Sequence, residues 1–200
     1  MNIPAVISIS GVSGVGKTVL LEWLLGIINL SGLIPSYTTR DPRPTDIGEY
    51  NYITPEQFKQ LKDDHEFAWF IDEYGNQYGT RSDDLYRAVA DARRIKKVSM
   101  LLIVPKTISN LRQYIWNYGG EVLSFYVSCN DENELRRRLL ARDNDPVLLE
   151  KRIEGSKNFY EQASHIADLR WIDNARDDNL AYAKEQVVRI LKMEGFTRLP

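Results

Sequence analysis

The sequence predicts an α/β protein with a doubly wound, mostly parallel sheet, and three observations carry that prediction. Strand-like and helix-like segments alternate along most of the 200 residues. The segments 99–104 and 122–127 are continuous apolar runs of strand length, as expected for parallel strands buried on both faces. A glycine-rich segment joins the first expected strand to the first expected helix. Such alternation is typical of a sheet covered by helices on both sides.

The expected elements follow in chain order. A short buried strand at 6–10 precedes a helix from 17 to about 30, and Gly32 stands where that helix should end. Thr54 begins a second helix with a capping box that Gln57 closes, and Ser82 begins a third. The later elements are the strands at 99–104 and 122–127, helices at 131–142 and from 145 to about 163, a strand at 169–172, and an amphipathic helix at 178–193 that Gly195 ends.

Residues 34–80 differ from the rest of the chain because they are aromatic, rich in turns and short-stranded. We expect them to form a small β-containing subdomain that holds a second substrate. No repeat, low-complexity tract or linker divides the sequence, so we predict a single domain over residues 1–200.

The composition narrows the class of protein and of partner. Apolar residues make up 43% and charged residues 27%, and the net charge of −2 gives no sign of a nucleic-acid or membrane partner. The apolar stretch 19–30 is too short and too interrupted to span a bilayer, and the amino terminus lacks a signal peptide's basic region. The single cysteine, Cys129, excludes an internal disulfide. A cytoplasmic monomer or homodimer is expected.

The glycine-rich segment is a complete Walker A motif, and each part has a physical role. Its glycines let backbone N–H groups turn inward around phosphate oxygens, and the following helix presents its positive end to the same anion. Lys17 is placed to meet the β- and γ-phosphates of ATP, and the Thr18 hydroxyl is a hard ligand suited to Mg²⁺. The predicted ATP-binding residues are Gly11, Val12, Ser13, Gly14, Val15, Gly16, Lys17 and Thr18. The motif makes the expected fold a P-loop NTPase three-layer sandwich.

A second motif follows the first helix. Arg40 and Arg43 stand three residues apart around a rigid proline, so their guanidinium groups can clamp one phosphate from two directions. Ser36 and Tyr50 can add neutral donors. A small phosphorylated acceptor is therefore predicted beside ATP.

Together these motifs resemble the guanylate kinase family, and the likeness covers nearly the full chain. The segments that carry it are the Walker A motif, Ser-Tyr-Thr-Thr-Arg-Asp-Pro-Arg at 36–43 and Tyr-Gly-Thr at 78–80. The resemblance implies a kinase with a core sheet, an acceptor-binding subdomain at 34–80 and a moving lid at about 138–152. It also implies that Ser36, Arg40, Arg43, Tyr50 and Tyr78 hold the acceptor phosphate and that Thr80 meets the base.

The same resemblance assigns arginines in the second half of the chain. Arg138, Arg142 and Arg152 match the family's lid arginines and are expected to neutralise charge on the transferring phosphoryl group. With Lys17 and Arg40 they are the predicted catalytic residues. Arg136 and Arg137 are expected to form only a solvated basic face.

The sequence departs from the family's pattern where the base is recognised. Trp69 stands where typical members carry a glutamate that accepts two N–H donors of guanine, and indole has no acceptor. Residues 101–106 contain no acid, although the family's pattern has acids there. We therefore expect that GMP is not the best acceptor, or that the protein discriminates in its favour much less than is usual in the family. The alternative is that Trp69 only packs in the core of the subdomain, while Asp72 or Glu73 moves in and reads guanine.

These features predict an ATP- and Mg²⁺-dependent nucleoside monophosphate kinase of the guanylate kinase type, acting on GMP, dGMP or another monophosphate. Two alternatives stay open at this point. One is a sugar-phosphate kinase of the ribose 1,5-bisphosphate type, which has also lost the base-reading acids. The other is a non-catalytic module that binds partners through the former acceptor site.

Overall fold

A computed structural model describes residues 3–143, 145–175, 180–197 and 199, without the side chains of residues 142 and 143. Its larger sheet has five strands in the order β2-β7-β1-β8-β9, and every pairing in it is parallel. The strands are β1 (Val6–Gly11), β2 (Ser31–Leu33), β7 (Val98–Leu102), β8 (Val122–Ser128) and β9 (Arg170–Asp173). The predicted α/β fold with a mostly parallel sheet is confirmed.

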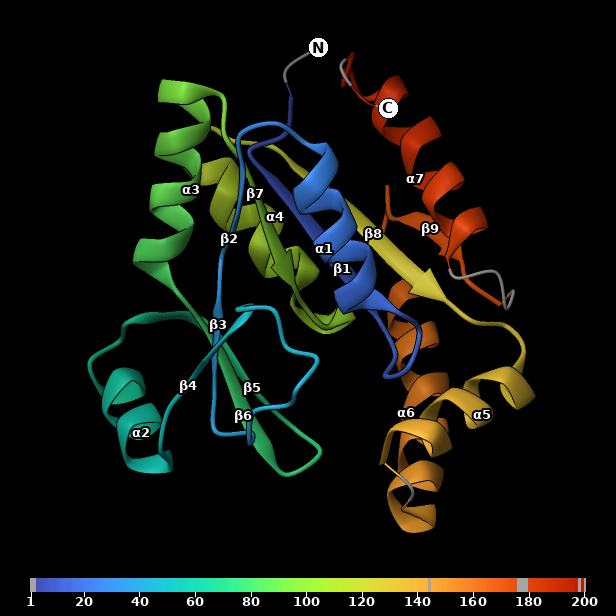
Figure 1. Cartoon of the computed structure of the whole chain (residues 1–200). Helices are drawn as coiled ribbons and strands as arrows, with labels where there is room; N and C mark the ends of the chain where they lie inside the picture. The colour runs from blue at the N-terminus through green and yellow to red at the C-terminus, as the bar shows by residue number, and fades with distance from the viewer. Residues whose placement is uncertain (1–2, 144, 176–179, 198, 200) are drawn as a thin grey trace.

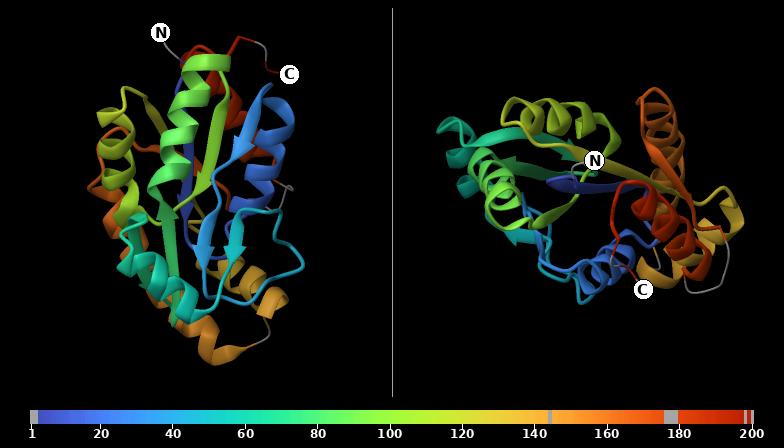
Figure 2. Two further views of the ribbon diagram at one scale, coloured as in Figure 1. Left: turned by 90° about the vertical axis from the view of Figure 1, so that its left-hand side faces the viewer. Right: turned by 90° about the horizontal axis from the view of Figure 1, so that it is seen from above.

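Helices cover both faces of this sheet and bury its side chains in two apolar clusters (Figures 1 and 2). On one face α1 (Lys17–Ile27) and α7 (Ala181–Met193) pack against Ile7 and Phe125. On the other face α3 (Ser82–Ile95) and α4 (Ile108–Asn117) pack against Val6 and Tyr126. Successive strand residues point to opposite faces, so a central strand such as β1 must be apolar on both, as its sequence predicted.

The second sheet has four strands in the order β4-β3-β6-β5. They are β3 (Ser36–Thr38), β4 (Tyr50–Tyr52), β5 (Phe67–Glu73) and β6 (Asn76–Arg81), and α2 (Pro55–Asp63) lies beside them. The capping box predicted at the start of α2 is present, with Gln57 N donating to Thr54 Oγ1. This sheet occupies the region expected to be β-containing, whereas its status as a separate subdomain remains a prediction.

The other helices, α5 (Glu132–Asp143) and α6 (Pro146–Ser164), lie across from the small sheet, at the end of the molecule where the P-loop leaves β1 (Figure 1). A short 3₁₀ turn, η1 (Pro105–Thr107), precedes α4. No helix among the described residues is long and apolar enough to cross a membrane.

Several boundaries differ from those expected. The first helix ends at Ile27 rather than near Leu30, and Gly32 lies inside β2, paired with Ser99 of β7. The strand expected at 99–104 is β7 and ends at Leu102. Helix α4 was not expected, although Ile108, Leu111 and Ile115 bury one face of it. The start expected for the last helix, Asp178, lies outside the described residues.

Candidate functional site

The P-loop is a compact turn between β1 and α1. Gly11 has φ +141°, and a Cβ there would lie 2.3 Å from the carbonyl oxygen of Val127, so only glycine fits beside β8. Gly16 has φ +86° and caps α1, which places the first turn of the helix at the loop. Lys17 Nζ donates to the carbonyl oxygen of Val12 at 2.7 Å and so lies across the loop. This is the arrangement that anion binding at a helix N-terminus requires.

One cavity of about 840 Å³ joins the P-loop, the small sheet and α5–α6, a volume within the usual range for small-ligand sites. It gathers predicted site residues that are far apart in the sequence. Those lining it are Gly11, Ser13, Gly14, Gly16, Lys17, Thr18, Ser36, Arg40, Arg43, Tyr50, Trp69, Tyr78, Thr80, Arg138 and Arg152. Val12 and Val15 instead bury their side chains in the core, so only their backbone is available to a phosphate. The side chain of Arg142 lies outside the described part.

The predicted phosphate clamp contains a carboxylate that the sequence did not single out. Arg40 is 8% exposed, and its Nη2 lies 2.8 Å from Asp46 Oδ2. The same oxygen accepts a hydrogen bond from the backbone N–H of Arg43 at 2.7 Å and another from the hydroxyl of Tyr52. Burial by itself raises the pKa of Asp46, but these three donors together outweigh it and lower the pKa below its ordinary value. Asp46 is therefore ionised and holds Arg40 in place at the cavity.

A pair of tyrosines lies beside Arg40. The guanidinium carbon of Arg40 lies 4.8 Å from the ring centroid of Tyr50, and Tyr50 packs edge-on against Tyr78. Burial raises the pKa of the Tyr50 hydroxyl, so it remains protonated. A protonated phenol beside a guanidinium group supplies a donor to a phosphate without adding negative charge.

Strands β5 and β6 line another end of the cavity. Trp69 of β5 pairs with Thr80 of β6, and both side chains line the cavity. Alternation along β5 brings Ile71 and Glu73 to the same side, whereas Asp72 is exposed and does not line it. Trp69 also packs against the second apolar cluster. The indole therefore lines the cavity and also packs against the apolar core.

The one acid of this end, among the described residues, is already engaged. Glu73 Oε2 lies 3.1 Å from Lys106 Nζ, which comes from the acid-free segment after β7. Of the two acids considered as substitutes for the missing glutamate, only Glu73 reaches the cavity, and a guanine would have to compete with Lys106 for it. This end of the cavity therefore offers few acceptors for the N–H groups of a purine.

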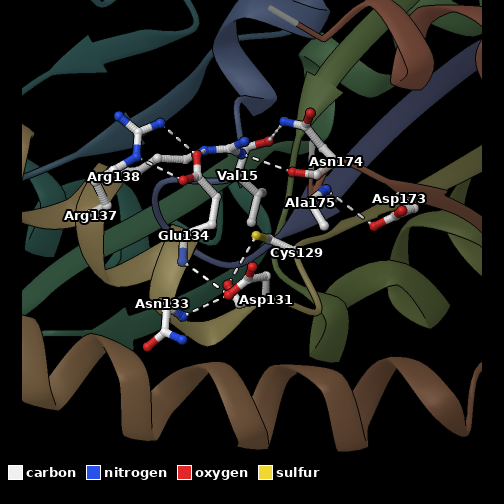
Figure 3. Close-up of polar contacts among 10 residues, drawn as sticks. All are labelled: Val15, Cys129, Asp131, Asn133, Glu134, Arg137, Arg138, Asp173, Asn174 and Ala175. Atoms are coloured by element: carbon white, nitrogen blue, oxygen red, sulfur yellow. Dashed lines mark hydrogen bonds and ion pairs between the residues drawn. The ribbon is translucent and has the colours of Figure 1, made fainter. Parts of the chain in front are cut away.

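Arg138 of α5, in the segment expected to form a lid, is tied to the P-loop through a buried asparagine (Figure 3). Arg138 Nε donates to Glu134 Oε1 at 2.6 Å, and its Nη1 donates to the carbonyl oxygen of Asn174 at 2.9 Å. Asn174 is 3% exposed, and its Nδ2 donates to the carbonyl oxygen of Val15 at 2.8 Å. Hydrogen bonds from Arg137 and Arg138 lower the pKa of Glu134 to about 2. Arg138 is thus held at the P-loop in this structure, and Arg152, 7% exposed, lines the same cavity from α6.

Arg136 and Arg137 of α5 form ion pairs away from the cavity. Arg136 pairs with Glu132 and Glu150, and Arg137 pairs with Glu134. Neither arginine lines the cavity.

The single cysteine, Cys129, follows β8. Burial raises the pKa of its thiol, which disfavours the reactive thiolate.

A further carboxylate lies at the P-loop itself. Glu49 is 2% exposed, and its Oε1 accepts a hydrogen bond from Thr18 Oγ1 at 3.2 Å, although 31 residues separate them in the chain. Among the polar residues of the site that the sequence analysis did not single out are Glu49, Asp46 and Asn174. The acids lie within the stretch that carries the acceptor motif, but nothing local in the sequence indicates which partners they meet.

Comparison with known proteins decides the family. A family model described as Guanylate kinase matches residues 4–190. The guanylate kinase of Geobacter metallireducens is 31% identical over 190 residues, covering 93% of this chain and 87% of the relative. The chain belongs to the guanylate kinase family. The guanylate kinase of Bacteroides thetaiotaomicron is 32% identical over 188 residues, covering 92% of this chain and 86% of that protein.

A solved structure agrees on the fold. The crystal structure of guanylate kinase from Anaplasma phagocytophilum aligns with a TM-score of 0.68 and 19% identity, covering 100% of this chain and 91% of that one. The predictions that the chain is a P-loop phosphotransferase, and a kinase of the guanylate kinase type, are confirmed. Its family binds ATP and a nucleoside monophosphate.

Proposed function

We propose that this guanylate kinase family member transfers the γ-phosphate of ATP to the phosphate of a nucleoside monophosphate and releases two nucleoside diphosphates. The observation that carries the proposal is that the Walker A loop and the Arg40–Arg43 clamp open into the same cavity. Two phosphate sites in one cavity suit a reaction between two phosphates. A cytoplasmic monomer or homodimer remains part of the proposal.

The residues around the cavity have different proposed roles, according to which phosphate they face. The P-loop N–H groups and Lys17 hold the β- and γ-phosphates of ATP, while Arg40, Arg43 and Tyr50 hold the acceptor phosphate. Arg138 and Arg152 neutralise the charge that spreads over the transferring group, and Arg142 is assigned the same role from the family resemblance alone. The acceptor phosphate is already a competent nucleophile, so the chain needs neither a general base nor a phosphoenzyme. Residues 34–80 and about 138–152 are proposed to close over the substrates.

The cavity fits a magnesium ion bound with the nucleotide. Among the described residues there is no cluster of three or more metal-ligating side chains, so a dedicated protein cage is absent from that part of the chain. Mg²⁺ in kinases takes most of its ligands from phosphates and water, with one or two oxygens from the protein. The Thr18 hydroxyl supplies such an oxygen. When bound, the ion would neutralise part of the negative charge on the nucleotide's phosphates.

The acceptor base is proposed to face Trp69, Ile71 and Thr80. Thr80 can donate to a carbonyl oxygen of guanine, thymine or uracil, whereas Trp69 and Ile71 accept nothing from the N–H groups of guanine. Burying such donors without acceptors costs about 1–3 kcal/mol for each group. We therefore propose weaker discrimination for GMP than a carboxylate at position 69 would give.

An acceptor screen tests both parts of the proposal. Purified protein with ATP and Mg²⁺ is given each common ribo- and deoxynucleoside monophosphate, and also ribose 1,5-bisphosphate, and diphosphate formation is measured. If GMP exceeds every other acceptor by 100-fold or more in kcat/KM, the altered base preference is rejected while the kinase stands. If none of the monophosphates is phosphorylated at a rate above that of Lys17→Ala, the proposed function itself is rejected.

A further inference from the structure

Four carboxylates line the cavity in the described part of the chain, and they differ in what they contact. They are Glu22, Asp46, Glu49 and Glu73. Asp46 pairs with Arg40 and Glu73 pairs with Lys106, so their charge is already balanced by a cation. Glu22 is exposed on α1. Of the four, only Glu49 accepts a hydrogen bond from Thr18, the threonine of the Walker A motif.

Both oxygens of Glu49 are held by hydrogen bonds in this position. Oε1 accepts from Thr18 Oγ1 at 3.2 Å, and Oε2 accepts from the backbone N–H of Ile47 at 2.6 Å. The residue is 2% exposed and directly precedes β4. A carboxylate this buried is expensive to keep unless its charge is used or compensated. A divalent cation beside Thr18 would compensate it.

The direction of the hydrogen bond determines what Thr18 can do. A threonine hydroxyl has one proton and two lone pairs, so a hydroxyl that donates to Glu49 keeps its lone pairs free for another partner. A hard cation is bound by such a lone pair and not by the proton. Outer carboxylates that orient a metal's ligands in this way raise metal affinity in many sites.

We infer that Glu49 is a positioning residue for the Mg²⁺ of the nucleotide, acting through the hydroxyl of Thr18. This inference rests on the proposed kinase function. Residues 101–106, at the end of β7, contain no acid. The negative charge beside the metal would come instead from Glu49, in the loop before β4. Glu49 is followed by Tyr50 of the acceptor clamp, so the same short segment serves both phosphate sites.

The experiment measures metal binding separately from catalysis. Mn²⁺ affinity for the protein–ADP complex is measured by electron paramagnetic resonance, and ADP affinity in EDTA is measured by calorimetry. Glu49→Gln should weaken Mn²⁺ binding about 10- to 100-fold, the usual effect of losing an outer-sphere partner, and should change ADP affinity in EDTA less than about twofold. Glu22→Gln removes the same charge from the same cavity without the Thr18 contact and should leave both values near wild type.

A second pair of variants tests the route through Thr18. Thr18→Val should weaken Mn²⁺ binding, and adding Glu49→Gln to it should weaken it little further, because the two residues act as one unit. If Glu49→Gln does not fold, Glu49→Asp replaces it, since the shorter side chain loses the Thr18 contact and the same loss is expected.

The outcomes separate this inference from the proposed function. Wild-type Mn²⁺ affinity in Glu49→Gln, an equal loss in Glu22→Gln, or fully additive losses in the double variant would overturn the role of Glu49 and leave the kinase intact. If wild-type protein binds ADP no differently with metal than in EDTA, the metal-dependent kinase and this inference fail together.

Discussion

Replacing Trp69 with glutamate tests how the cavity reads a base. Trp69 lies opposite Thr80 in the β5–β6 pairing, so a carboxylate in its place would face a base that Thr80 contacts. Guanine offers an N1–H and an N2 amino group side by side, and two buried donors without acceptors cost about 2–6 kcal/mol in total. An acceptor for these two donors would raise kcat/KM for GMP, by about tenfold for each 1.4 kcal/mol recovered.

The apolar surroundings reduce that gain. The new carboxylate would lie near Ile71 and Ile103, and desolvating it costs part of what the hydrogen bonds return. If about 1.4–2.8 kcal/mol remains after that cost, Trp69→Glu should raise kcat/KM for GMP about 10- to 100-fold relative to dTMP or UMP. Because the half-buried indole also packs against the second apolar cluster, we expect a loss of about 2 kcal/mol in the free energy of unfolding.

The chain offers a matched control in the next residue. Phe70 is 42% exposed and does not line the cavity, so Phe70→Glu also replaces an aromatic side chain of β5 with a carboxylate, but on the opposite face. A coupled assay of diphosphate formation, with GMP, dTMP and UMP as acceptors, gives the ratio for each variant. Equal ratios in Trp69→Glu and Phe70→Glu, with both proteins folded by circular dichroism, would refute the reasoning.

Four other perturbations have defined outcomes. Lys17→Ala should remove most transferase activity and change the free energy of unfolding by less than about 1 kcal/mol, as measured in urea, and normal turnover would contradict the P-loop assignment. Arg40→Met or Arg43→Met should lower kcat/KM for the acceptor by an amount equivalent to about 2–4 kcal/mol of activation free energy. An equal loss of ATP affinity would argue against a dedicated clamp. Arg138→Met should lower kcat more than it changes either KM, because its contacts are proposed to complete on closure. Glu134 has a pKa of about 2, below its unfolded value, so the stability that it adds is present above about pH 4 and is lost as the pH falls toward 2. Urea midpoints between pH 5 and 2.5 should therefore fall less in Glu134→Gln than in wild type. If the midpoints of the two proteins fall in parallel with pH, Glu134 is not the source of this pH dependence.

What the sequence alone determined is local in the chain. The Walker A motif is eight consecutive residues, so its strand–loop–helix geometry follows from glycine positions and from the apolar strand before it. The capping box of α2 spans four residues and forms as expected. Apolar runs and helical periodicity predicted the order of most elements because each signal is contained within one element.

Only the tertiary structure decided which distant residues meet. Gly32 follows a helix and reads as its end, but pairing with β7 places it in a strand instead. Glu49 reaches Thr18 across 31 residues, and Asn174 reaches Val15 across 159, and no spacing rule connects such pairs. Polar contacts of this kind depend on how the two sheets and their helices pack, because a hydrogen bond needs atoms placed within a few tenths of an ångström. The phosphate sites were therefore predictable from motifs, whereas the carboxylates that hold Arg40 and Thr18 became visible only once the chain was folded.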